Sequence, residues 1–174
     1  MNRRWLLIAI LASWWSILFS QEAAIRLTGV PNFVRVDDYV YRGGQPTNQG
    51  LAGLAKAGIK TVIDLRNGTE QLQPEKSVVE ALGMRYVHVP MRSLEAPQDN
   101  DVRRVLALLD SREPVFVHCR RGKDRTGTVI ACYRIEHDKW PNQKALAEAK
   151  ASGMSSFEWD MQRFILHFEE NAWR

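Results

Sequence analysis

The sequence predicts a single α/β domain in which a mostly parallel central sheet is flanked by helices, with an N-terminal β-hairpin. Three observations support this fold class. Segments with strand and helix patterns alternate between residues 59 and 137, which is the order that builds a parallel sheet. The short apolar segment 114–119 leads into a glycine-containing loop, as a central parallel strand does. The 174 residues, of which 45% are hydrophobic, suffice for one domain with a core but not for two.

Residues 1–23 differ from the rest of the chain. Two arginines precede an apolar run from Trp5 to Phe19. This run is shorter than the about 20 residues that a membrane-spanning helix usually needs, so it favours a signal peptide. The small residues near position 20 form a poor cleavage site, however, and a retained membrane anchor stays open. In either case we expect the folded domain at 31–172 to lie outside the cytoplasm, exported to the periplasm or the extracellular space or anchored to the membrane.

The first predicted elements are a hairpin, a helix and a strand. The stretch FVRVDDYVYRGG at 33–44 contains two alternating runs around a pair of aspartates, which is typical of a β-hairpin. Thr47 is a candidate helix N-cap and Gly58 a candidate stop, so we expect a helix between them. The apolar stretch IKTVIDLR at 59–66 predicts a strand.

The remaining elements continue the alternation. Pro74 opens and Gly83 closes a predicted helix over 74–82. A strand at 84–91 follows, then a polar loop and a helix at 101–110, whose apolar residues have helical spacing. The later expected elements are a strand at 114–119 and helices near 126–137, 141–151 and 157–171.

The stretch HCRRGKDRTG at 118–127 crowds four cations around one of only two cysteines. If a strand ends at Cys119 and a helix begins at Thr126, the residues between them must turn sharply. Such a loop aims successive backbone N–H groups inward, and the helix N-terminus adds positive charge. The stretch therefore predicts a site for a phosphate-sized anion. The residues of this phosphate loop are Arg120, Arg121, Gly122, Lys123, Asp124 and Arg125.

Cys119 is the predicted nucleophile at this site. The positive field that binds an anion also favours the thiolate over the thiol. A thiolate beside a bound phosphate can attack phosphorus, which gives a phosphocysteine. Arg125 can hold two phosphate oxygens with its planar guanidinium, and the hydroxyl of Thr126 can donate to the sulfur and ease its later departure.

Other interpretations of the loop fit the residues less well. A rhodanese-type sulfur carrier has a shorter loop, and a nucleotide-binding loop needs glycine where this chain has Val117. The chain has neither a C-x-x-C pair nor paired histidines, so we expect no metal and no cofactor. A buried, inert cysteine beside a chance cluster of arginines is the remaining alternative. Cys132 lies in an apolar helical stretch, so we expect it in the core and not in a disulfide with Cys119.

The motif resembles the signature of the cysteine-dependent protein tyrosine and dual-specificity phosphatase superfamily. Five residues separate Cys119 from Arg125, and the flanking His118 and Gly127 complete the pattern HCxxGxxRTG. The stretches YVYRGGQPT and GIKTVIDLR are similar to the small dual-specificity-type phosphatases of bacteria, plants and fungi. That resemblance implies that Asp64 and Arg66 help to build the wall of the site; a structurally paired Asp and Arg is the alternative.

The acid that protonates the leaving group is harder to identify. The resemblance implies an Asp on the loop between a strand and the helix that precedes the cysteine strand. Here that loop is MRSLEAPQDND, which has no clear counterpart of the familiar Asp. Glu95 is the favoured candidate and Asp99 the next. Asp99 and Asp101 can alternatively cap the following helix or interact with its dipole. His88 and His118 are weaker candidates, because hydrogen-bonded structural histidines are the more common outcome.

Three functions remain open at this point. The leading one is a phosphatase acting on phosphotyrosine, with phosphoserine or phosphothreonine as further substrates. Lys123 and Asp124 in the loop also suit an inositol-phosphate or phosphoinositide phosphatase, and the third possibility is a weakly catalytic phosphate-binding module. The first twenty residues hold two of the 24 cations and no acid, which leaves 22 basic against 20 acidic residues. This mild excess does not indicate a nucleic-acid partner, and nothing in the sequence sets the oligomeric state.

Overall fold

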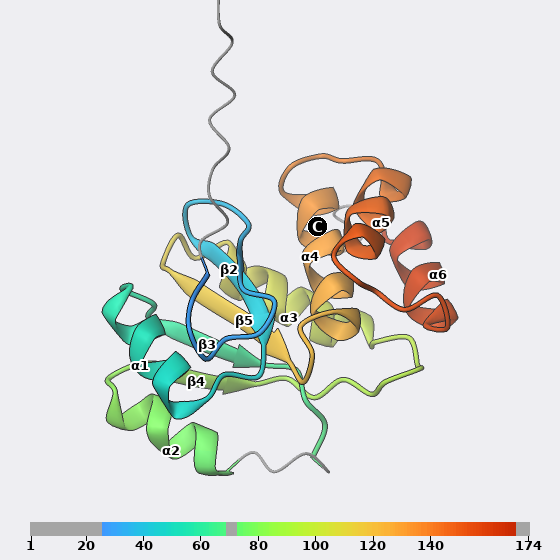
Figure 1. Ribbon diagram of the computed structural model, residues 1–174. Coiled ribbons are helices and arrows are strands. Elements are labelled where there is room, and N and C mark those ends of the chain that lie inside the picture. The colour runs from blue at the N-terminus through green and yellow to red at the C-terminus, as the bar shows by residue number, and fades with distance from the viewer. Residues whose placement is uncertain (1–25, 69–72, 170–174) are drawn as a thin grey trace, which may run out of the picture.

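The computed structural model describes residues 26–68 and 73–169 and contains a five-stranded sheet of order β1-β2-β5-β3-β4, flanked by helices (Figure 1). The expected signal peptide or anchor lies outside the described residues. Within the described ranges, no helix is long and apolar enough to cross a membrane. The strands are β1 (Val34–Arg35), β2 (Val40–Gly44), β3 (Thr61–Asp64), β4 (Arg85–His88) and β5 (Val115–Cys119). The helices are α1 (Asn48–Lys56), α2 (Gln73–Ala81), α3 (Asp99–Leu109), α4 (Asp124–Glu136), α5 (Asn142–Ala151) and α6 (Trp159–His167).

The sheet confirms the predicted fold class. Strands β2, β5, β3 and β4 are parallel, and β1 pairs with β2 in antiparallel fashion as the expected hairpin. The side chain of Asp37 shapes the hairpin turn, because its Oδ1 accepts hydrogen bonds from the backbone N–H groups of Tyr39 at 2.7 Å and Val40 at 2.8 Å. β5 lies in the centre of the sheet, with β2 on one side and β3 on the other.

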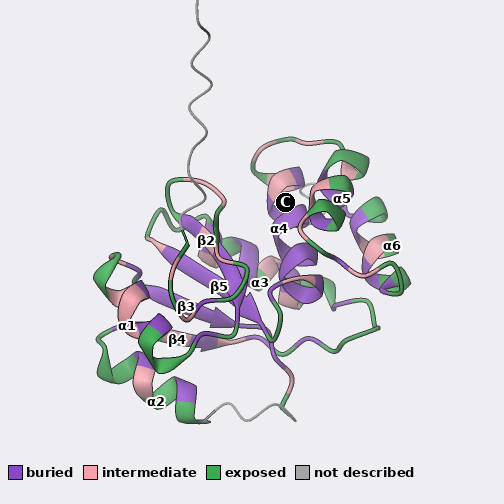
Figure 2. Cartoon of the chain, viewed as in Figure 1, coloured by how far each residue is buried: buried purple, intermediate pink, exposed green. Residues whose placement is uncertain are grey.

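Helices cover both faces of the sheet, and alternate residues of each strand serve the two layers. On β3, Val62 packs in the cluster under α1 and α2, whereas Ile63 packs in the larger cluster under α3 to α6. Phe116 on β5 joins the first cluster and its neighbour Val117 the second. The helices α1 and α2 lie together on one side in Figure 1, and α4 to α6 on the other. Because both faces are covered, the central strands are buried along their whole length (Figure 2).

Local signals at the helix ends are confirmed. Thr47 is the N-cap of α1, and its Oγ1 accepts a hydrogen bond from the N–H of Gly50 at 3.2 Å. Gly58 and Gly83 follow α1 and α2 with φ of +89° and +77°, the left-handed conformation that ends helices. The start of α4 differs from the prediction, since the helix begins at Asp124, two residues before Thr126. Part of the phosphate loop is therefore already the first turn of α4.

Candidate active site

The phosphate loop joins the carboxyl end of β5 to the N-terminus of α4, where parallel sheets carry their ligand sites. Gly122 gives the loop its sharp turn with φ of +71°. A Cβ at this position would lie 2.2 Å from the carbonyl carbon of Gly43, so the backbone of β2 passes too close for any side chain. The loop thus needs glycine for its conformation and for its packing.

Three successive carbonyl groups fix the orientation of the loop. In a trans peptide unit the N–H points opposite to the C=O. The carbonyl groups of residues 120–122 are hydrogen-bonded to neighbouring segments outside the loop. The N–H groups of residues 121–123 therefore point into the loop, where they can form the predicted anion-binding site. The hydrogen bonds are Gln45 N–H to Arg120 O at 3.2 Å, Asn32 Nδ2 to Arg121 O at 2.8 Å and Arg42 Nη2 to Gly122 O at 2.9 Å.

Cys119 ends β5 at the mouth of this site, with only 2% of its surface exposed. It carries a free thiol, as does Cys132, so the expected absence of a disulfide is confirmed. Cys132 is fully buried in α4, and burial raises the pKa of its thiol well above the ordinary value. The two cysteines therefore have different environments, one at a loop that can bind anions and one in the apolar core.

Arg42 is a site residue that sequence reasoning missed. Its side chain is 3% exposed and reaches from β2 to the phosphate loop. Burial lowers the pKa of its guanidinium, against the opposing attraction of Glu148 and of an ionised Cys119. A buried cation on the neighbouring strand thus interacts electrostatically with Cys119, the predicted nucleophile. Its only sequence signal is its place in YVYRGG, the stretch whose register against β5 brings Arg42 beside Val117.

Arg125 lies in the first turn of α4, 5% exposed, and its Nη1 is 3.4 Å from the carbonyl oxygen of Met91. This contact connects Arg125, the predicted phosphate clamp, with the loop that precedes α3. Asp124 has a structural role: its Oδ2 pairs with Arg121 at 2.8 Å and its Oδ1 accepts from the N–H of Ser155 at 2.8 Å. The side chains of Arg120 and Arg121 are exposed, and that of Lys123 is half-buried.

The proposed donor to the sulfur is not seen in that role. Thr126 is completely buried, but its Oγ1 has no hydrogen-bond partner among the described residues. The hydrogen bond to Cys119 expected from the sequence is therefore not formed in this structure. A buried hydroxyl without a partner is costly, so Thr126 is available for a new hydrogen bond when the site is occupied.

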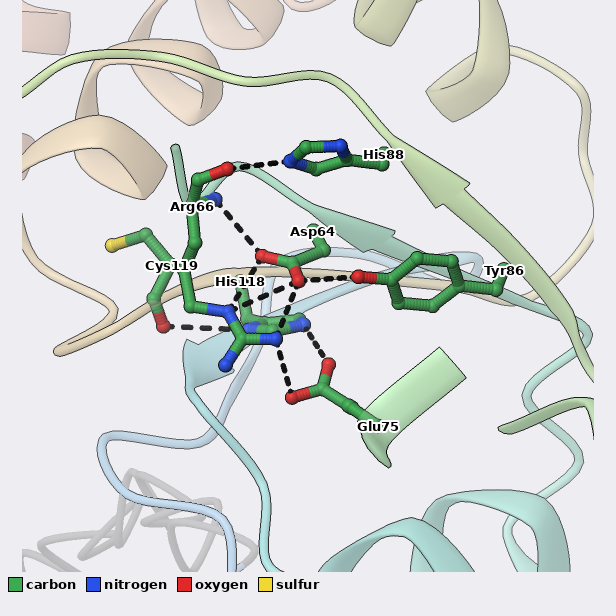
Figure 3. A network of polar contacts seen from close by, with 7 residues as sticks. All are labelled: Asp64, Arg66, Glu75, Tyr86, His88, His118 and Cys119. Carbon is green, nitrogen blue, oxygen red and sulfur yellow. Dashed lines mark hydrogen bonds and ion pairs between the residues drawn. The ribbon is translucent and has the colours of Figure 1, made fainter. Parts of the chain in front are cut away.

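Beside Cys119 lies a network of polar side chains (Figure 3). Arg66 donates from Nε and Nη2 to Asp64 at 2.5–3.0 Å and from Nη2 to Glu75 at 2.8 Å, and Tyr86 donates to Asp64 at 2.6 Å. Burial opposes ionisation of Asp64, but its hydrogen bonds from Arg66 and Tyr86 outweigh that effect and lower its pKa. Asp64 and Arg66 are 0% and 1% exposed, so they form the structurally paired alternative rather than an open wall.

His118 lies between this network and the start of the phosphate loop. Its Nε2 lies 2.8 Å from Oε1 of Glu75, although the two groups are not aligned for a hydrogen bond, and its Nδ1 lies 3.3 Å from the carbonyl oxygen of Cys119. Asp64, Glu75 and His118 each offer a ligand atom within 4.8 Å of the others. The guanidinium of Arg66 already bridges both carboxylates and supplies the cation there, so these residues fit a salt-bridge network better than a metal.

The acid candidates from the sequence lie on the surface. Glu95 has 58% of its side chain exposed and pairs with Arg92 at 3.3 Å. Asp99 is the exposed first residue of α3 and not its N-cap, which is Gln98. His88 is a structural histidine, since its Nε2 lies 2.6 Å from the carbonyl oxygen of Arg66. The acidic roles of Glu95 and Asp99 stay predictions.

Glu158 is a carboxyl near the site that the sequence did not reveal. It falls inside the stretch 157–171 that was expected to be a helix, where an acid looks like an ordinary surface residue. In the structure it precedes α6, is 3% exposed, and accepts a hydrogen bond from the N–H of Leu94 at 2.9 Å. It therefore joins the loop that carries Glu95 to the segment before α6.

The strand-loop-helix with Cys119 and Arg125, set in this sheet, places the chain among the cysteine-dependent protein tyrosine and dual-specificity phosphatases. Residues 26–166 match the family model of a DSP-PTPase phosphatase fused to NAD+ kinase, and the chain belongs to that family. The crystal structure of TpbA from Pseudomonas aeruginosa is similar, with a TM-score of 0.68 and 26% identity over 80% of this chain and 86% of that one. The catalytic core of the PP-IP phosphatase SIW14 from Saccharomyces cerevisiae has a TM-score of 0.69 at 21% identity, over 84% and 89% of the two chains.

Similar proteins of known name differ in the activity that they are named for. The dual specificity protein phosphatase TpbA of Pseudomonas aeruginosa is 31% identical over 70% of this chain and 55% of its own length. The phosphatidylglycerophosphate phosphatase PTPMT2 of Arabidopsis thaliana is 32% identical over 59% of this chain and 47% of its own length. The inositol diphosphatase DSP5 of the same plant is 28% identical over 80% and 70%. The chain thus spans about half the length of the first two, and their substrates differ.

Proposed function

We propose that this protein hydrolyses phosphomonoesters through a phosphocysteine intermediate, as a protein tyrosine phosphatase with dual specificity. One observation carries the proposal: Cys119 stands at the mouth of a loop whose N–H groups face inward, with the buried guanidinium of Arg125 in the adjoining helical turn. The N–H groups and the cation stabilise the charge on the transferred phosphoryl group, and the sulfur attacks it.

Trapping of the intermediate tests this proposal. The wild-type protein is mixed with an aryl phosphate, quenched in acid within the first turnovers and digested for mass spectrometry. We expect a phosphoryl adduct on the peptide that contains Cys119 and a burst of released phenol. Turnover without any adduct on Cys119 in rapidly quenched samples, and with no burst, would contradict the phosphocysteine mechanism.

An inositol-phosphate substrate is the second candidate. The exposed side chains of Arg120 and Arg121, with the half-buried Lys123 beside them, surround the loop with cations beyond the one that binds the transferred phosphate. Additional phosphates on an inositol ring can pair with such cations. A panel of phosphotyrosine, phosphoserine and phosphothreonine peptides and inositol phosphates, compared by kcat/KM, separates the two substrate classes. A preference for the inositol phosphates would replace the leading candidate.

A further inference from the structure

The burial of residues 157–159 is the reverse of what their types predict. Phe157 and Trp159 are 74% and 70% exposed, whereas the carboxyl residue between them, Glu158, is 3% exposed. Burying a carboxyl group while leaving two aromatic rings in water is unfavourable unless the carboxyl has specific partners. Glu158 also occupies the N-cap position of α6 without capping that helix through its side chain. Its side chain points instead to the loop before α3, where it accepts the N–H of Leu94.

The partner of Glu158 lies in the loop before α3. The Oε2 of Glu158 accepts the N–H of Leu94 at 2.9 Å, and Leu94 holds φ of +64°, which side chains rarely adopt. The same loop contacts the predicted phosphate clamp, because the carbonyl oxygen of Met91 lies 3.4 Å from Nη1 of Arg125. Glu158 is therefore fixed against the loop that borders the phosphate site.

The charged groups that affect the Glu158 carboxyl are residues of the phosphate loop, namely Asp124, Arg121 and Arg125. Burial raises the pKa of its carboxyl, and the charge of Asp124 raises it further, while the Leu94 N–H, Arg121 and Arg125 oppose the rise. A phosphate dianion bound in the loop would neutralise Arg125 and add negative charge, which favours the protonated carboxyl still more. Glu95 differs, since 58% of its side chain is exposed and its partner is Arg92.

We propose that Glu158 is the catalytic acid of this site. The proposal rests on the phosphocysteine mechanism described above. As the sulfur of Cys119 forms its bond to phosphorus, the bond from phosphorus to the ester oxygen breaks, and the Glu158 carboxyl transfers its proton to that departing oxygen. Glu158 is left as a carboxylate. It then accepts a proton from the water that attacks the phosphocysteine, so that the thiolate and the carboxyl group are both restored.

Glu158→Gln and Glu158→Ala separate proton donation from loop anchoring. Glutamine can still accept the Leu94 N–H but has no acidic proton, whereas alanine loses both functions. The measurement is kcat/KM over aryl phosphates, from activated nitrophenyl to unsubstituted phenyl phosphate. We expect Glu158→Gln to lose about 10²-fold with the poorest leaving group and little with the most activated one. Glu95→Gln tests the competing acid candidate, and if Glu158 is the acid this variant should follow the wild type across the series.

Two results would overturn the assignment. If Glu158→Gln follows the wild type across the series while Glu158→Ala loses activity equally with all substrates, Glu158 only anchors the loop. If Glu95→Gln shows the leaving-group dependence and Glu158→Gln does not, Glu95 is the acid. Both results leave the phosphocysteine mechanism standing, because that mechanism is tested by the adduct on Cys119 of the wild-type protein.

Discussion

Cys119 is surrounded by groups that come from different parts of the chain. Arg42 lies on β2 and Arg125 on α4, and His118 precedes Cys119 on β5. The arginines provide positive charge on two different elements, and the His118 ring lies between the carbonyl oxygen of Cys119 and Glu75 of the buried network. The residue that reacts is therefore only one part of the site, and substitutions around it should have distinguishable effects.

Replacing Cys119 by serine should abolish turnover and leave anion binding largely intact. The alcohol is far less nucleophilic than a thiolate at neutral pH, whereas the backbone N–H groups and Arg125 remain. Turnover of an aryl phosphate and calorimetric titration with inorganic phosphate measure the two properties. Substantial residual turnover in Cys119→Ser would show that the sulfur is not the nucleophile.

Replacing Arg125 by lysine should lower kcat/KM by about 10²-fold or more, because an ammonium group cannot hold two phosphate oxygens in a planar fork. Arg104→Lys is the matched control, since Arg104 is an exposed residue of α3. It should behave as the wild type. An Arg125→Lys enzyme within about threefold of the wild type would mean that Arg125 does not act as the clamp.

At the scale of elements, the connection from β5 to α4 works because β2 supports it. The backbone of Gly43 and Gly44 lies beside the loop, and residues 32, 42 and 45 bind its carbonyl groups. The loop therefore keeps its shape through contacts with a segment far away in the sequence. A change that pushes the loop away from β2 should damage the site without touching any reacting group.

Gly122→Ala provides that change. The added Cβ would meet the Gly43 backbone at 2.2 Å in a conformation with φ of +71°. We expect a loss of activity of at least about tenfold and of about 1–3 kcal/mol in the free energy of unfolding. Gly58→Ala is the control: it has φ of +89° but no atom within 4 Å of the new Cβ. It should lose about 1 kcal/mol of stability and keep its activity. Equal activity in Gly122→Ala and Gly58→Ala would contradict the claim that β2 holds the phosphate loop in its active shape.

Local sequence signals predicted the elements well, because the signals and the structures they specify lie in the same short segment. Thr47 and Gly58 bound α1, and the cysteine motif sits at the strand end that it predicted. Arg42 and Glu158 could not be found in this way. Each joins the site through pairing or packing between distant segments, and neither lies in a motif that indicates such contacts.

At the scale of the whole molecule, the buried network of Asp64, Arg66, Glu75 and Tyr86 should make stability depend on pH. The folded-state pKa of Asp64 is lowered, so its contribution is present above the unfolded value of about 4. That contribution is lost as the pH falls through the lower folded value. Asp64→Asn should cost about 3–5 kcal/mol in the free energy of unfolding at pH 7, since it removes one partner of a buried pair.

Urea denaturation at several pH values measures this effect. The difference between wild type and Asp64→Asn should shrink as the pH falls below about 4, where the unfolded chain binds the proton first, and it should be smallest below the lowered folded-state pKa of Asp64, where neither protein has a charge on residue 64. Asp38→Asn is the matched control, as Asp38 pairs with Arg35 at the surface with 81% of its side chain exposed. It should change stability little at any pH. A difference for Asp64→Asn that is constant with pH would contradict this account.

The pairing of β2 with β5 also bears on how the protein is made. During synthesis β2 is made long before β5. Gly44 can pair with Cys119, its partner in the sheet, only after the elements between them in the sequence have been made. Pairing between such distant segments has a loop-closure cost, which makes it slow. A growing chain thus holds the support for the phosphate loop before it holds Cys119, and the predicted nucleophile reaches its position only when β5 is inserted into the sheet. We therefore expect catalytic activity in a newly made molecule to report that β5 has paired with β2.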